Sequence, residues 1–476
     1  MINTKQFFTK YSIWLLILIF FVAYSALAVG KHLRFETSAA DLGIYAQSVW
    51  HYSSFRAPIS SIKNFNQLGD HFNPTLALFA PFYWIWPNAQ VLLIAQSLLV
   101  TFGALPIYWL AKEKLGEVAG LILSFAYLAF PGTQAGIDFN FHPEVVAATW
   151  IGFSIYFLLK KKFFWYAVFA ILALGSKEDI APIFAGLGIY ILLVKRWYRL
   201  GFATLIISIF WFYVTTSILM PYFAGSIIKP LAIHSKAAGL LSNLFFNQPE
   251  FFKTLTYPFD KVETVLTLFG SFAFIPATSP LAWFTTPATF ANRFVSDDWS
   301  RWSTHFQYSS TIAPLLAIAV IFGIENLKKL FKKINFAKLK FLLLAAILVG
   351  TFWTNRPGWD PPFITPPLQQ VAKRSFWKLS ENQKLVHQIL KKIPHEASVA
   401  TNTNYVPYLI NRNKIYAIPD VREKPEIYFL TTFNLAQDKT LAKFEEEIKK
   451  LRQSKDYQLI FEKDGILLFA KKSVKI

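Results

Sequence analysis

The chain has 476 residues, of which 54% are hydrophobic, 18% are aromatic and only 16% are charged, against roughly a quarter charged residues in soluble domains. The formal net charge is +20, but the lysines gather in short links between apolar runs, a pattern of cytoplasmic loops that gives no reason to invoke a nucleic-acid partner. The sequence contains no cysteine, which excludes disulfides, thiolate nucleophiles and zinc–cysteine sites.

Apolar runs near the length that spans about 30 Å of hydrocarbon recur along the first three quarters of the chain. They predict an α-helical polytopic membrane protein with about eleven spans, several shorter than the usual length of about 20 residues. The first run, Tyr11–Gly30, is long for a signal-peptide core, so a retained signal anchor is favoured over a cleaved signal peptide. The spans are expected near residues 12–30, 90–111, 117–131, 143–159, 163–176, 178–194, 199–220, 261–276, 279–293, 307–325 and 340–354.

Charge placement orients these spans. With the N-terminus in the cytoplasm, the lysine-rich links fall inside, and an odd number of spans puts the C-terminus outside the cytoplasmic membrane. The acidic residues, which were not used for this assignment, segregate in the same way: Glu113, Glu117 and Glu325 fall inside. The outer side holds, among others, Asp41, Asp70, Asp138, Glu144, Glu178, Asp179, Asp297 and Asp298. We therefore expect one face of the protein to carry its chemistry.

The run Pro74–Pro87 is apolar but short and contains an internal proline. It predicts an interfacial or re-entrant helix within a first outer loop at 31–89, with Tyr83, Trp84 and Trp86 at the level of the lipid head groups. A true span is the alternative. It would turn every lysine-rich link outward, so the interfacial interpretation is preferred.

The composition changes after a transmembrane domain at 1–354, and residues 355–476 predict a small extracytoplasmic α/β domain. Prolines 357, 361, 362, 366 and 367 indicate a stiff linker, and Ser380 with Gln383 resembles a capping box. Strands are expected at 397–401, 414–419 and 426–431, a helix at 438–454, and a hairpin around Asp464-Gly465. The domain has neither GxGxxG nor a P-loop, so no nucleotide site is expected.

The first constellation that could carry chemistry lies just after the first span. Asp41, Tyr45 and Gln47 belong to a predicted short helix, and Asp70 with His71 lies at the far end of the same loop. Asp41 also fits a helix N-cap, because Asp before an amphipathic stretch caps helices well. The second acid–imidazole pair favours a site.

The second constellation lies between the predicted third and fourth spans. Asp138, His142 and Glu144 cluster at a membrane boundary, where packing alone does not account for them. Such a set suits a divalent cation, Mg²⁺ or Mn²⁺. The alternative is a solvated loop with Glu144 near a helix start.

The third constellation is Lys177-Glu178-Asp179, which interrupts a long apolar stretch. Three consecutive ionisable residues near bilayer depth are expensive and indicate function. A tight turn whose charges reach water is the alternative. Lys177 is a candidate ligand for a phosphate group.

The fourth constellation lies between the predicted ninth and tenth spans, where two arginines and a histidine suit an anionic head group. It contains Arg293, Arg301, His305 and Tyr308. An ordinary outer loop is equally compatible. Trp299 and Trp302 fit either interfacial anchoring or stacking on a sugar.

The motifs, taken together and in order, resemble a known family. They are DLGIYAQSVW, HFNPTLALFAPFYWIWP, GALPIYWLAKEKLG, DFNFHPE, KED and HFQYSSTIAP. The sequence resembles domain-of-unknown-function family 2079, multi-pass membrane proteins of bacteria and archaea that are similar to GT-C glycosyltransferases. The resemblance implies a polyprenyl-phosphate sugar as donor, Asp41 as catalytic base, Asp138 as the acid of the second outer loop, and Lys177 near the lipid phosphate. Many GT-C enzymes carry an acidic pair in the first loop, whereas Asp41 is flanked by Ala40 and Leu42.

The leading hypothesis is an inverting glycosyltransferase at the outer membrane face, with membrane lipid as its surroundings and a glycan, lipid or protein as acceptor. Asp41 and Asp138 are the catalytic candidates, and a divalent cation at Asp138, His142 and Glu144 is an option. The candidates for substrate binding are Tyr45, Gln47, Asp70, His71, Lys177, Glu178, Asp179, Arg293, Arg301, His305 and Tyr308. A transporter or flippase of a lipid-linked or anionic substrate, and a non-catalytic membrane scaffold, are the alternatives.

Overall fold

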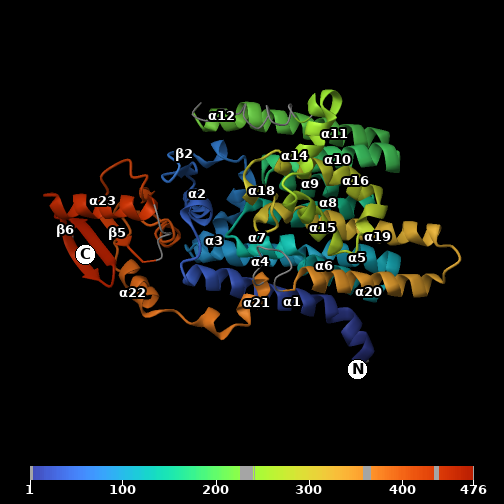
Figure 1. Ribbon diagram of the computed structural model, residues 1–476, viewed down its shortest axis with the longest axis horizontal. Helices are drawn as coiled ribbons and strands as arrows, with labels where there is room; N and C mark the ends of the chain where they lie inside the picture. The colour runs from blue at the N-terminus through green and yellow to red at the C-terminus, as the bar shows by residue number, and fades with distance from the viewer. Residues whose placement is uncertain (1–3, 226–239, 241, 357–365, 434–438, 475–476) are drawn as a thin grey trace. The chain divides into compact units, whose positions relative to one another are not determined.

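The computed structural model describes residues 4–225, 240, 242–356, 366–433 and 439–474 (Figure 1). The chain divides into two compact units. The first comprises Met1–Ala28, Leu68–Thr75 and Ile94–Ala372, and the second comprises Val29–Gln67, Leu76–Leu93 and Lys373–Ile476. The unit that holds the C-terminal residues therefore also includes much of the predicted first outer loop.

The first unit is helical. Its longer helices are α1 (Thr4–Leu33, which continues into the second unit), α4 (Gln90–Phe102), α5 (Ala104–Leu115), α6 (Glu117–Leu128), α7 (Pro131–Asp138), α8 (Pro143–Leu159), α9 (Phe163–Leu174), α10 (Ala181–Tyr190), α11 (Tyr198–Val214), α14 (Gln248–Thr256), α15 (Asp260–Gly270), α17 (Pro287–Phe294), α19 (Ile312–Leu330) and α20 (Phe336–Thr354). Short elements between them are η2 (Gln67–Gly69), η3 (Pro74–Phe79, which continues into the second unit), η4 (Glu178–Ile180), η5 (Ile191–Lys195), η6 (Thr215–Leu219), α12 (Met220–Phe223), η7 (Ile275–Thr278), α16 (Pro280–Thr285), α18 (Trp299–Trp302), η8 (Gln307–Ser309) and α21 (Pro367–Val371).

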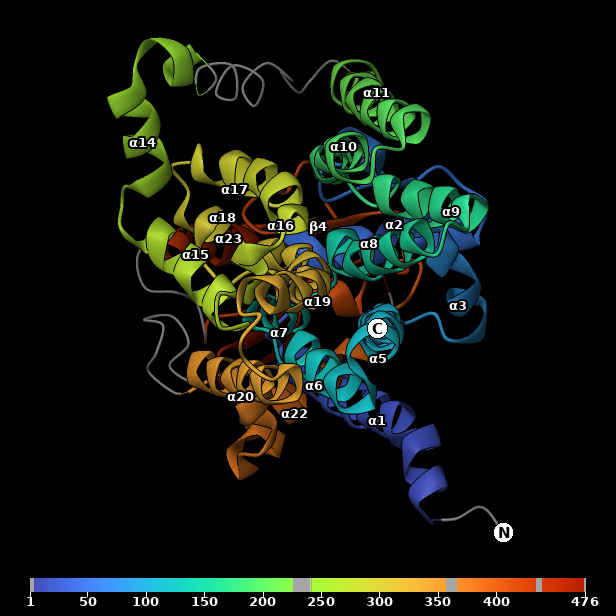
Figure 2. The same cartoon turned by 90° about the vertical axis from the view of Figure 1, so that its right-hand side faces the viewer.

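Helix α19 is the centre of this unit. Its residues from Ile312 to Ile321 are buried without interruption, because this stretch is apolar on all sides. It packs against α5, α8 and α16, which surround it in Figure 2. Glycine allows close approach nearby: a Cβ on Gly186 of α10 would lie 1.9 Å from the carbonyl oxygen of Phe284 in α16.

Fewer helices qualify as spans than the eleven expected. Among the described residues, four are long and apolar enough: Tyr11–Leu33, Gln90–Leu115, Tyr198–Phe223 and Phe336–Thr354. The count rises to six if two bent pairs are each one span, α6 with α7 (44°) and Trp299–Ser309 with α19 (70°). The segment expected as a span at 279–293 is instead two short helices, α16 and α17. The full number of spans stays a prediction.

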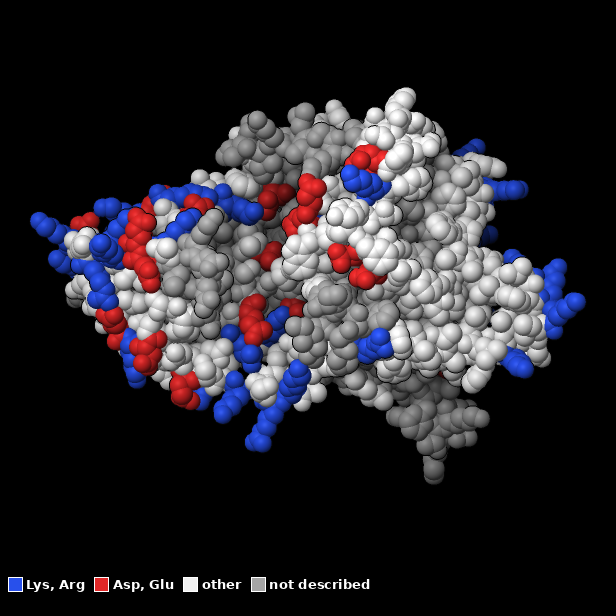
Figure 3. Space-filling view, viewed as in Figure 1, with Lys and Arg blue, Asp and Glu red and all other residues white. Residues whose placement is uncertain are grey.

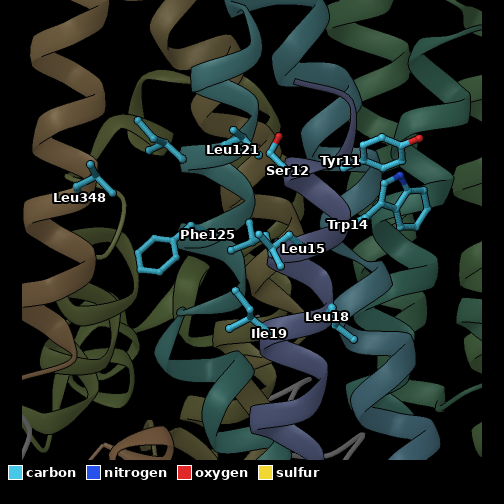
Figure 4. Close-up of a pocket in the computed structure, with 11 residues that line it drawn as sticks. Tyr11, Ser12, Trp14, Leu15, Leu18, Ile19, Leu121, Phe125 and Leu348 are labelled. Carbon is cyan, nitrogen blue, oxygen red and sulfur yellow. The ribbon is translucent and has the colours of Figure 1, made fainter. Parts of the chain in front are cut away.

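The surface of this unit matches a membrane environment. Figure 3 shows a largely uncharged body, with Lys and Arg gathered at the end where α19 connects to α20. Helices α1, α6 and α20 also line an apolar groove of about 690 Å³, with Trp14, Leu121 and Phe125 among its walls (Figure 4). Such a groove is compatible with hydrocarbon chains.

The second unit contains the mixed sheet. Its elements are η1 (Ala39–Gly43), α2 (Ile44–Ser53), β1 (Ile59–Ser60), β2 (Phe65–Asn66), α3 (Ala80–Ile85), η9 (Arg374–Trp377), α22 (Glu381–Leu390), β3 (Val399–Thr401), η10 (Val406–Tyr408), β4 (Ile415–Ala417), β5 (Ile427–Thr431), α23 (Lys439–Gln453), β6 (Tyr457–Lys463) and β7 (Ile466–Lys471). The strand order is β4-β3-β5-β7-β6; β3 runs parallel to β4 and β5, and β7 runs antiparallel to β5 and β6. Phe444 of α23 joins Leu430 and Phe469 in the core beneath the sheet.

Local sequence signals in this unit are confirmed. The Ser380 hydroxyl accepts the Gln383 N–H, and the Gln383 side chain accepts the Ser380 N–H, which completes the capping box. Asp464 and Gly465 have φ values of 48° and 76°, as a two-residue hairpin turn requires. Prolines 357, 361 and 362 of the expected linker and the helix start at 438 lie outside the described residues.

The interfacial segment 74–87 needs one correction. It forms η3 followed by α3, and Trp84 and Trp86 are exposed, which agrees with the predicted interfacial position. Tyr83, however, is only 3% exposed, because it points into the unit rather than outward. It therefore packs as a core residue.

The absence of cysteine makes the predicted orientation directly testable. In intact cells, a membrane-impermeant maleimide should label Lys424→Cys, on the exposed surface near β5, because that domain is predicted to lie outside. Lys333→Cys, in the α19–α20 link, should react only after the membrane is opened. The parent chain, with no cysteine, is the blank. The reverse labelling pattern would invert the topology.

Candidate functional site

A buried ion pair lies at the turn between α9 and α10. The ammonium of Lys177 lies 2.7 Å from Oε1 of Glu144, and the two side chains are only 6% and 5% exposed. Asp179 Oδ2 lies 4.0 Å from the same ammonium. Burial opposes the charged form of Lys177, yet the carboxylates of Glu144, Asp179 and Glu178 outweigh it, so the pKa of Lys177 lies above its ordinary value. The lysine is therefore charged and held in place.

Glu178 ties the first loop to this turn. Its Oε1 lies 2.7 Å from Nδ1 of His71, and its Oε2 accepts the backbone N–H of Phe72 at 3.1 Å. Burial opposes protonation of His71, but the charge and hydrogen bond of Glu178 prevail and raise the pKa of the imidazole. His71, Lys177 and Glu178, singled out separately in the sequence, therefore belong to one cluster.

Two further contacts extend the cluster to α17 and η8. Asp179 accepts a hydrogen bond from the amide of Asn292 at 3.2 Å. The ammonium of Lys177 lies 5.6 Å from the centre of the Tyr308 ring, and the guanidinium of Arg301 lies 5.9 Å from the same centre, both within the usual cation–π range. A Cβ on Gly132 of α7 would lie 2.6 Å from Ser309, so α7 and the Tyr308 turn pack directly together.

The two arginines play different parts. Arg293 is 2% exposed and donates to the carbonyl oxygens of Arg301 and Ser303 and to the Ser309 hydroxyl, so it holds the 301–309 segment in shape. Arg301 faces Tyr308, and its buried Nε has no hydrogen-bond partner among the described residues. No carboxylate of the described residues forms an ion pair with either arginine. The available positive charge in this region is therefore that of Arg301.

The second outer constellation does not assemble as expected for a metal. Asp138 ends α7, and His142 directly precedes α8, in whose first turn Glu144 lies. Among the described residues no group of three or more His, Asp and Glu side chains could hold a metal ion. Glu144 faces the Lys177 ammonium instead, so the described residues give no support to the cation expected at Asp138, His142 and Glu144.

Two residues of this region carry no signal that sequence analysis used. Gln96 of α4 is fully buried; its amide donates to the carbonyl oxygen of Asn140 and accepts the backbone N–H of His142, which fixes the loop between α7 and α8. Asn73 is 1% exposed, and both polar atoms of its side chain lack hydrogen-bond partners among the described residues. Because such burial is costly, Asn73 is a candidate for ligand contact.

Asp41 belongs to the second unit and is not an N-cap. It lies inside the π-helical turn η1, whose N-cap is Ser38, and the next helix begins only at Ile44. The backbone N–H of Ala39 donates to the carbonyl oxygen of Thr403 at 2.8 Å, which anchors the turn. The π turn stands at the start of the helical segment, after the extended residue Ser38, and runs directly into α2.

The neighbours of Asp41 have structural tasks. Gln47, expected to bind substrate, is fully buried; its amide donates to the Ser61 hydroxyl and to the carbonyl oxygen of Arg412 and accepts the Ser61 N–H. Tyr45 is 5% exposed. Two other candidates, Asp70 and His305, belong to the first unit and are half-buried. Asp41 itself is half-buried.

Residues 31–468 match the family described as "Predicted membrane protein (DUF2079)", and the chain belongs to this family. No curated protein sequence matches the chain.

The solved structure of ArnT from Cupriavidus metallidurans bound to undecaprenyl phosphate shares 14% identity and a TM-score of 0.57 over 97% of this chain and 98% of that one. The apo state gives 14% identity and 0.55 over 95% and 97%. The apo oligosaccharyltransferase of Archaeoglobus fulgidus gives 12% identity and 0.43 over 87% and 65%. The likeness to ArnT confirms the GT-C-like fold predicted from the sequence.

Glu144→Gln should destabilise the protein by about 3 kcal/mol, because it leaves the buried Lys177 ammonium without its nearest counter-charge. The thermal unfolding midpoint in detergent measures the effect. Glu113→Gln is the matched control: Glu113 also pairs with a lysine, Lys160, at 2.6 Å, but the two side chains are 55% and 32% exposed, so the loss should stay below about 1 kcal/mol. Equal shifts in the two variants would contradict the role of burial.

The His71–Glu178 pair should make stability depend on pH. Because the folded pKa of His71 is raised above its ordinary value of 6.5, its contribution is full below that pH and is lost as pH rises through the folded value. We expect the difference in unfolding midpoint between the native chain and His71→Asn to shrink from pH 6 to pH 9. A difference that stays constant over this range would show that His71 acts without its charge.

Proposed function

We propose that this DUF2079 protein is a GT-C-type glycosyltransferase that transfers a sugar from a polyprenyl-phosphate donor to an acceptor hydroxyl. The reaction would take place at the outer face of the cytoplasmic membrane, where the acidic residues are expected, and would invert the anomeric centre. The fold resembles that of ArnT, which was solved with undecaprenyl phosphate. The acceptor belongs to the class of glycans, lipids or proteins that carry a free hydroxyl.

The observation that carries this proposal is the buried cluster of charges around Lys177. Ion pairs in an interior contribute little net stability, because desolvation offsets the attraction between the charges. Replacing a buried ion pair by well-packed apolar residues of similar volume is often neutral or even stabilising, so stability alone is a weak reason for a chain to keep the pair of Glu144 and Lys177. Charged groups kept in the interior of a membrane protein therefore support a functional role.

The cations of this cluster have the chemistry to hold the donor phosphate. An ammonium has three donors, and Glu144 takes one from Lys177 at 2.7 Å. The guanidinium of Arg301 has no carboxylate partner among the described residues and presents a planar fork suited to phosphate oxygens. We assign Arg301 the main contact with the phosphate, with Lys177 supporting it and Asn73 as a further donor.

Asp41 is proposed as the general base. As the acceptor oxygen attacks the anomeric carbon, its proton passes to the Asp41 carboxylate, while the bond from that carbon to the phosphate oxygen breaks. The polyprenyl phosphate leaves with the bonding electrons, so charge and atoms balance. A single displacement of this kind inverts the centre, by the geometry that governs inverting glycosidases. Asp138 is proposed to orient the substrate.

The test is turnover of radiolabelled polyprenyl-phosphate sugars by the purified full-length chain. Asp41→Asn should lower the rate at least about 100-fold, because a lost general base costs that much or more, while the unfolding midpoint stays unchanged. Asp420→Asn is the matched control: Asp420 is an exposed acid of the same unit, paired with Arg422, and its loss should leave the rate unaltered. Full activity of Asp41→Asn would remove the assigned base.

A flippase for a lipid-linked substrate is the second candidate. The two bent helix pairs, at 44° and 70°, favour it, because broken helices are characteristic of transporter sites. Donors that bind and cross the bilayer of reconstituted vesicles without any change in the labelled sugar linkage would support transport and contradict transfer.

A further inference from the structure

The second unit contains a cavity that the proposed reaction does not use. Its volume is about 640 Å³, within the range of small-molecule sites. Helix α22 forms one wall, and the segment 408–412 forms another. Among the described residues that line it, Lys384, His387, Lys391, His395 and Arg412 carry or can carry positive charge, and none is Asp or Glu.

The positive charge is only partly balanced. Lys384 pairs with the exposed Glu381 at 2.7 Å, and such a surface pair is weak. No carboxylate of the described residues pairs with Lys391. Arg412 is 4% exposed and donates to the carbonyl oxygens of Leu409, Pro394 and Ala397, so its guanidinium is held inside the wall, where the charge of Glu396 acts on it. The cavity therefore presents a positive potential to whatever enters it.

The other lining groups suit a hydroxylated ligand. Asn88, Gln90 and Asn411 contribute amides, and Oδ1 of Asn411 is a buried acceptor without a partner among the described residues. The aromatic ring of Tyr408 and the side chains of Leu379 and Ile393 add apolar surface. Nε2–H of His387 donates to the carbonyl oxygen of Leu33 at 2.8 Å, which leaves Nδ1 for a ligand. Amides, a flat ring and cations together fit a sugar that bears an anionic group.

Hydrogen bonds and close packing connect the wall of the cavity with the turn that carries Asp41. The Arg412 carbonyl oxygen accepts from the buried amide of Gln47, and the Thr403 carbonyl oxygen accepts from Ala39 at the start of η1. Gly43 of the same turn approaches Val406 so closely that a Cβ would lie 3.0 Å from its Cγ1. One segment, 403–412, therefore supports both features within this unit.

We propose that this cavity binds an anionic saccharide, a sugar bearing a phosphate or carboxylate, with Lys391, Lys384 and His395 at the charged group. Its further role as the subsite that selects an acidic acceptor rests on the proposed function. Binding itself does not, because the cavity is complete without the cluster around Lys177.

Calorimetric titration of the full chain in a non-ionic detergent tests the proposal. The probes are glucose 6-phosphate, glucuronate, glucose and inorganic phosphate. We expect one or both charged sugars to bind at least about tenfold more tightly than glucose, because hydrogen bonds to charged groups contribute about 1.5–3 kcal/mol. Inorganic phosphate should bind more weakly than glucose 6-phosphate. Equal binding of glucose, equal binding of inorganic phosphate, or no binding of either acid overturns the proposal.

Lys391→Gln should weaken binding of the charged sugars about tenfold. Lys392→Gln is the matched control, because the neighbouring lysine is also exposed but does not line the cavity. Equal losses in the two variants would indicate general surface attraction and overturn the site. Unfolding midpoints within error of the native chain confirm that both variants fold.

The two proposals fail separately. Binding of a charged sugar by a chain that transfers no sugar from any donor keeps the cavity and rejects the transferase. Turnover without binding of either charged sugar in the titration keeps the transferase and rejects the cavity. Asp41→Asn should leave the affinity of the cavity unchanged, because Asp41 is not among its lining residues.

Discussion

The constraint on which the first unit depends is the charge of one buried lysine. A fixed ammonium in an apolar interior must be surrounded by acceptors, and Lys177 recruits them from separate places in the chain: Glu144 at the start of α8 and Asp179 in its own turn. Glu178 in turn captures the first loop through His71 and Phe72. The contacts around this one charge therefore bring together the start of α8, the turn between α9 and α10, and the first loop. A reaction would need a fixed geometry at such a place.

Some buried polar residues of this protein hold segments in place, and others are candidates for contact with a substrate. Their hydrogen-bond partners distinguish the two groups. Gln47 uses its whole amide to hold neighbouring segments, and Arg293 uses Nε and Nη2 to hold the 301–309 segment, while its buried Nη1 has no hydrogen-bond partner among the described residues. Arg301 has an unmatched charge beside an aromatic ring, and Asn73 has a buried amide without partners among the described residues. Unsatisfied polar groups are costly, so those that persist indicate where a substrate is expected.

The sequence predicted those features that depend on residues close together in the chain. The capping box at Ser380 and the turn at Asp464-Gly465 depend on adjacent residues, and both are present. It also located Lys177 and Glu178 as special. It could not predict that Glu144 would face Lys177, since the two are separated by a complete helical hairpin and the acid looked equally suited to a metal. The role of Gln96 in holding the loop between α7 and α8 could not be predicted either, because its partners Asn140 and His142 are distant in the sequence. Hydropathy also cannot tell a short or bent helix from a full crossing, which is why the described helices that qualify by length and composition are fewer than the spans expected.

The π turn at Ala39–Gly43 has a consequence for tolerance to insertion and deletion. A π turn holds one residue more than the α-helical turn it replaces, and each helical residue advances the side-chain direction by about 100°. Removing a single residue between 39 and 43 would let the chain continue as a regular helix and swing the carboxylate to another face, while the composition hardly changed. The number of residues in this segment therefore constrains the position of the carboxylate more than their types do. In relatives with the same chemistry, the residues around the acid should vary in type but not in number.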